Sequence, residues 1–82
     1  MPIRTGFITH VAKHPRHSQR FDVWLLGPLP LYTLDPLHAS LCERAGAIHK
    51  AVTIHTKDSR YGEEIVEVTL ADWALTETEV GA

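Results

Sequence analysis

The fold of this chain is decided by residues 35–46, the segment Asp35-Pro36-Leu37-His38-Ala39-Ser40-Leu41-Cys42-Glu43-Arg44-Ala45-Gly46. An aspartate at its start can accept hydrogen bonds from the first free amides of a helix, and proline suits the first helical position. Gly46 is expected to end the helix in a left-handed conformation. Leu37, Leu41 and Ala45 recur every four residues, which predicts a single apolar stripe. The segment therefore predicts one short helix.

Alternating apolar residues predict β-strands on both sides of this helix. Three such runs precede it and two follow it, at residues 7–12, 21–26, 31–34, 51–56 and 63–70. Val52, Ile54 and Thr56 illustrate the pattern, because they share the face that is expected to point inward. Pro28 and Pro30 interrupt the ladder between the second and third runs, because proline has no amide hydrogen to donate. The resulting order of elements is β-β-β-α-β-β.

This order, over about residues 6–70, resembles that of the OB-fold. The resemblance implies a mainly β protein with one helix, folded as a five-stranded Greek-key barrel whose open end the helix covers. Residues 1–75 would form a single small β-barrel domain and residues 76–82 a flexible C-terminal tail, with Trp73 and Leu75 available to dock against the barrel. An SH3-like barrel is the main structural alternative.

Charge is distributed unevenly along the 82 residues. The formal net charge is −2, with an excess of cations in residues 1–41 and of acids in residues 42–82. This asymmetry permits a basic patch on an acidic protein. One cysteine, Cys42, excludes an intramolecular disulfide and favours a reducing compartment. The chain has no apolar run of about 20 residues and its start lacks a signal peptide, so we expect a cytoplasmic protein without a membrane partner.

The resemblance also implies a binding surface. OB-folds use the loops between strands 1 and 2 and between strands 4 and 5, together with the face of strands 2 and 3, to hold oligonucleotides or oligosaccharides. The corresponding residues are Lys13, Arg16 and Arg20 in the first loop, Lys57, Arg60 and Tyr61 in the second, and Trp24 and Tyr32 on or near strands 2 and 3. Cations that follow phosphates and aromatics that stack on bases suit single-stranded DNA or RNA. The alternative is that these loops are polar only because they are solvated and that the aromatics belong to the core.

The uncharged segment at residues 23–32 supports a second hypothesis. Both faces of its strand are apolar, since Trp24 and Leu26 mirror Val23 and Leu25. Something is expected to cover the outer face: the C-terminal tail, a second copy in a homodimer, or another protein. The chain would then be a protein–protein interaction module, an adaptor, an inhibitor or a subunit of a larger assembly. Net acidity favours this hypothesis, and the clustered loop cations favour nucleic acid.

Neither metal binding nor catalysis is predicted. His10, His14 and His17 have a ligand-like spacing that would need a helix, which Pro15 opposes. His38 and Cys42 supply only two ligands. The chain has no glycine-rich phosphate loop, nucleophile elbow or cysteine–histidine signature. We therefore expect a non-enzymatic protein without a cofactor.

Overall fold

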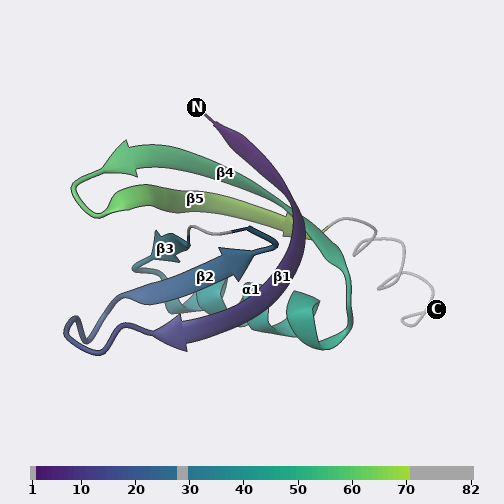
Figure 1. Ribbon diagram of the computed structural model, residues 1–82, viewed down its shortest axis with the longest axis horizontal. Coiled ribbons are helices and arrows are strands. Elements are labelled where there is room, and N and C mark those ends of the chain that lie inside the picture. The colour runs from purple at the N-terminus through teal and green to yellow at the C-terminus, as the bar shows by residue number, and fades with distance from the viewer. Residues whose placement is uncertain (1, 28–29, 71–82) are drawn as a thin grey trace.

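The computed structural model describes residues 2–27 and 30–70 as a mainly β protein with a single helix and a five-stranded sheet (Figure 1). The elements are β1 (Ile3–Lys13), β2 (Phe21–Leu25), β3 (Leu31–Thr33), α1 (Pro36–Ala47), β4 (Ala51–Ser59) and β5 (Gly62–Leu70). The predicted order of elements is confirmed. The predicted tail at residues 76–82 and the docking residues Trp73 and Leu75 lie outside the described residues. No helix in the described part of the chain is long and apolar enough to cross a membrane.

Every strand of the sheet pairs with two others. The hydrogen-bonded order is β1-β2-β3-β5-β4, and β4 pairs with β1. All neighbours are antiparallel except β3 and β5, which are parallel where Tyr32 pairs with Glu64. β1 joins two ladders, because residues 3–7 pair with β4 and residues 8–13 pair with β2. This arrangement leaves one side of the sheet facing the core and α1.

An irregularity in β1 decides which of its residues face the core. Ile8 pairs with Leu25 and Val11 pairs with Val23, so three steps along β1 match two steps along β2. The register shift lies between Ile8 and His10. Since simple alternation would send Ile8 and Val11 to opposite faces, the extra residue allows both to pack against the core. Beyond the shift, His10 lies opposite Trp24 on the outer face.

The helix begins as predicted and ends differently. Asp35 accepts a hydrogen bond from the Leu37 amide, and Pro36 occupies the first turn. Gly46 does not stop the helix: α1 continues to Ala47, and the residue with positive φ is His49, at 57°. A Cβ at position 46 would lie 3.5 Å from the Ile8 side chain, so the glycine sits where α1 packs closely on β1.

The predicted apolar stripe of α1 is confirmed only in part. Ala45 is buried and Leu41 packs against the core, but Leu37 is exposed. The buried helical residues are Ala39, Cys42 and Ala45. Small side chains at these three positions let the helix approach the sheet closely. Burial raises the pKa of the Cys42 thiol to about 11, so the thiol stays protonated at neutral pH, the form that is a poor nucleophile.

Gly46 and Gly62 form a matched pair for substitution by alanine. Gly46→Ala should be neutral or stabilise by up to about 1 kcal/mol, because the added methyl group makes ordinary contact with Ile8 and alanine favours a helix. Gly62→Ala should destabilise by about 1–2 kcal/mol, because φ is +116° at this position. Urea denaturation followed by circular dichroism measures both. A Gly46→Ala variant less stable than Gly62→Ala would contradict these placements.

Candidate nucleic-acid interface

The loop between β1 and β2 lies beside the turn between β4 and β5, as the sequence predicts. The His17 ring meets the Tyr61 ring edge to face, with centroids 5.6 Å apart and an interplanar angle of 79°. The Arg20 guanidinium carbon lies 5.2 Å from the Tyr61 centroid. Residues 13–20 and 57–62 therefore contribute to one surface, and Tyr61 is the point at which they meet.

The β4–β5 connection is tighter than expected. β4 extends through Ser59 and β5 starts at Gly62, so only Arg60 and Tyr61 remain in the turn. Gly62 supplies the positive φ that such a turn needs. Lys57 therefore belongs to a strand, where it pairs with Glu64.

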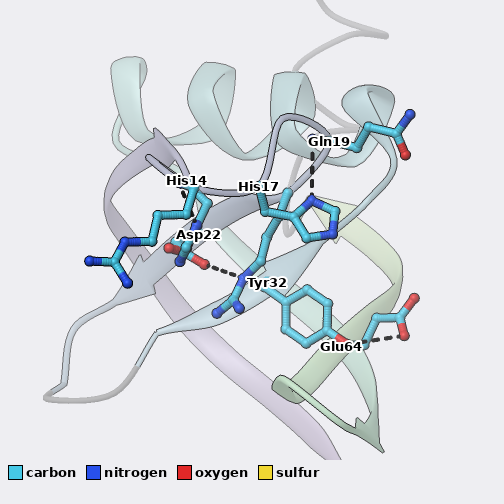
Figure 2. A network of polar contacts seen from close by, with 8 residues as sticks. His14, His17, Gln19, Asp22, Tyr32 and Glu64 are labelled. Atoms are coloured by element: carbon cyan, nitrogen blue, oxygen red, sulfur yellow. Dashed lines mark hydrogen bonds and ion pairs between the residues drawn. The ribbon is translucent and has the colours of Figure 1, made fainter.

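Two histidines shape the β1–β2 loop. The His14 amide donates to the Arg20 carbonyl at 2.8 Å, and the Arg20 amide donates to the His17 carbonyl at 3.1 Å. The Arg16 amide donates to His14 Nδ1 at 3.1 Å, and the Gln19 amide donates to His17 Nδ1 at 3.3 Å (Figure 2). Both imidazole rings accept hydrogen bonds from backbone amides within the loop, much as aspartate and asparagine side chains do in turns.

Arg20 is held inside a polar cluster on the outer face of β2 and β3. Its Nε donates to Asp22 Oδ1 at 2.9 Å, with the two side chains 16% and 12% exposed. Its guanidinium carbon lies 4.7 Å from the Tyr32 centroid. The Tyr32 hydroxyl donates to Glu64 Oε1 at 3.3 Å, and Figure 2 shows both labelled side chains in the network. We refer to Arg20, Asp22, Tyr32, Tyr61 and Glu64 as the Arg20 cluster.

This cluster changes the roles expected of two predicted ligand residues. Tyr32 is only 2% exposed, because Arg20 and Tyr61 cover it, so it offers no ring face on which a base can stack. Arg20 is committed to Asp22 through Nε and cannot move freely toward a phosphate. Tyr61 remains accessible, with 42% of its surface exposed.

The other four predicted cations are free at the surface. Lys13, Arg16, Lys57 and Arg60 are all exposed. In residues 2–27 and 30–70, no side-chain hydrogen bond or ion pair engages any of them. Their charges are thus available to a ligand, although Glu64 faces Lys57 across the ladder.

Trp24 forms a second aromatic surface with a partner that the sequence did not indicate. His10 lies parallel to it, with ring centroids 4.0 Å apart and an interplanar angle of 9°. Thr9 Oγ1 donates to the Trp24 carbonyl at 3.0 Å and fixes the strand there. Trp24 and Asp22 are two residues apart, so both point to the outer face, roughly 7 Å apart along the strand. The stacked pair therefore lies on the same face as the Arg20 cluster.

The described part of the chain holds no group of three histidine, cysteine, aspartate or glutamate side chains placed to bind a metal ion. Comparison of the chain with protein-family models, with curated proteins and with solved structures finds no match.

Proposed function

We propose that this chain is a small, non-catalytic domain of the OB type that binds single-stranded DNA or RNA. Two features support the Greek-key barrel architecture: the strand order β1-β2-β3-β5-β4 with β4 returning to β1, and the position of α1 between β3 and β4. In such a barrel, the loops that meet here are those that contact the ligand.

The observation that carries the proposal is the meeting of the two loops at Tyr61, with four unpaired cations in or beside those loops. The exposed Tyr61 ring can stack on a base, while the cations follow the phosphates on either side. The His10–Trp24 pair would extend this track along the outer face of β2. At moderate salt, acids far from the two loops do not oppose binding, because charge acts over roughly 10 Å there.

A salt titration tests this function. Fluorescence anisotropy of a labelled oligonucleotide should show affinity at low salt, and log affinity should fall with log salt concentration at a slope of about −3. This slope corresponds to about 0.7 for each of four phosphate contacts on a single strand. A duplex of the same sequence should bind more weakly, because its bases are not free to stack. Absence of binding to any single strand at low salt would end the proposal.

A protein-interaction role rests on a different surface. Leu26 is 83% exposed and lies with the exposed Ile3 and Phe7 on a groove of about 620 Å³. Val23 and Leu31 of the predicted apolar segment are instead in the core. Exposed apolar patches often bind proteins. Self-association that Leu26→Glu abolishes, measured by sedimentation velocity, would favour this function.

A further inference from the structure

A pocket of about 440 Å³ lies beside the β4–β5 turn, lined among others by Arg20, Asp58, Ser59 and Tyr61. Its size falls within the range of small-ligand pockets, about 300–1,000 Å³. Its lining also includes Glu63 and therefore combines a guanidinium, two carboxylates, a hydroxyl and an aromatic ring. A planar ligand that carries both hydrogen-bond donors and acceptors matches this lining.

The Arg20 guanidinium is held in a fixed position at this pocket. Asp22 engages its Nε, and the Tyr32 ring lies against its face. Within the residues that the structure describes, its two Nη groups have no hydrogen-bond partner. An arginine fixed in this way loses little conformational entropy on binding, and its paired donors match two adjacent acceptors.

Asp58 supplies a carboxylate without a partner. It is exposed, and among the described residues it forms no ion pair or side-chain hydrogen bond. Glu63 lies directly opposite in the ladder, and like charges in such pairs destabilise a sheet. Glu63 Oε1 accepts from Arg4 and from Thr56 Oγ1, so Glu63 is neutralised where Asp58 is not. A ligand with two N–H donors would supply hydrogen bonds to the unpaired carboxylate of Asp58.

We propose that this pocket binds one unstacked guanine base of the single strand. The guanine N1–H and N2–H₂ groups are adjacent donors for the Asp58 carboxylate, while O6 and N7 are adjacent acceptors for the Arg20 Nη groups. The Tyr61 ring supplies the stacking face. Adenine has no oxygen acceptor at its sixth position, and uracil and cytosine do not present paired donors and paired acceptors on two edges. The inference rests on the proposed function and adds a base preference to it.

The test compares single strands that differ in one base. A uridine tract of about twelve nucleotides, within the site size of such domains, is measured with and without one central guanosine. Guanosine should raise affinity about tenfold, or about 1.4 kcal/mol. Adenosine should give no gain, and inosine, which lacks the N2 amino group, should give a smaller one. Asp58→Asn should abolish the gain and leave uridine-tract affinity the same or slightly higher.

The control is Glu67→Gln, which makes the same charge change at an exposed β5 position that does not line the pocket. It should keep the full guanosine preference. Equal affinity for all the tracts, or a guanosine preference that survives Asp58→Asn, would contradict the proposed guanine pocket. The proposal of single-strand binding would be unaffected. Failure of every tract to bind at low salt would overturn both proposals.

Discussion

Replacing Arg20 with alanine is expected to lower the free energy of unfolding by about 3 kcal/mol. The substitution leaves the Asp22 carboxylate buried without its cation and uncovers the Tyr32 ring. Breaking a buried ion pair costs about 3–5 kcal/mol, and the partial exposure of both side chains puts this pair at the lower end. Urea denaturation monitored by tyrosine and tryptophan fluorescence gives the value.

A double-mutant cycle separates the ion pair from the packing. Asp22→Asn combined with Arg20→Ala should be less destabilising than the sum of the single changes, because no unpaired carboxylate is left. The free energy of unfolding of Arg20→Lys should lie between those of Arg20→Ala and the wild type. Lysine keeps the charge but loses the planar group that lies against Tyr32. A loss below about 0.5 kcal/mol for Arg20→Ala would show that the cluster contributes nothing beyond an ordinary surface contact.

Reversing charge at Arg16 and Arg60 should reduce oligonucleotide affinity about thirtyfold at low salt while the fold stays intact. The two residues come from the two loops that meet at Tyr61, and neither side chain has a partner within the described residues. Turning two weak attractions into repulsions amounts to about 2 kcal/mol. The salt slope should also become shallower by about 1.4, or 0.7 for each lost contact. Anisotropy titrations of the Arg16→Glu/Arg60→Glu variant measure both quantities.

Arg44→Glu/Lys50→Glu is the matched control for net charge. It makes the same overall change near the end of α1, which lies at the far side of the molecule from both loops (Figure 1). Its affinity should fall by no more than a few-fold, and circular dichroism should show that it is folded. Equal losses in the two double variants would mean that binding depends on net charge alone, and the loop surface would lose its assigned role.

The order of elements was predictable from the sequence because its signals are local. Asp35 and Pro36 start the helix through contacts within one turn, and the alternation of Val52, Ile54 and Thr56 matches the observed burial. The end of the helix was not predictable, because Gly46 remains helical and the residue with positive φ is His49, a residue type that does not signal a helix end. The register shift in β1 was also not predictable, because it depends on how β1 pairs with β2.

The position of the candidate site was predictable, and its residues were predictable only in part. The resemblance implied that the two loops would lie on the same side, and the observed strand order brings them together. Whether a cation is free depends on its neighbours in space: Arg20 faces Asp22 and Tyr32, while Arg16 faces none of the described acids. The spacing of Arg20 and Asp22, two residues apart at the start of β2, was the available signal for the ion pair. The His10–Trp24 pair could not be predicted from the sequence, because it depends on the register between β1 and β2.

The double pairing of β1 has a consequence for how the chain folds. Ile3 pairs with His55, so the first half of β1 stays unpaired until β4, far along the chain, has formed beside it. Contacts so distant in sequence slow folding, because the chain loses entropy before it gains them. We expect a chain shortened to about residue 50 to leave the backbone amides and carbonyls of residues 3–7 unpaired on an open strand edge, and therefore to aggregate more readily than a chain that includes β4.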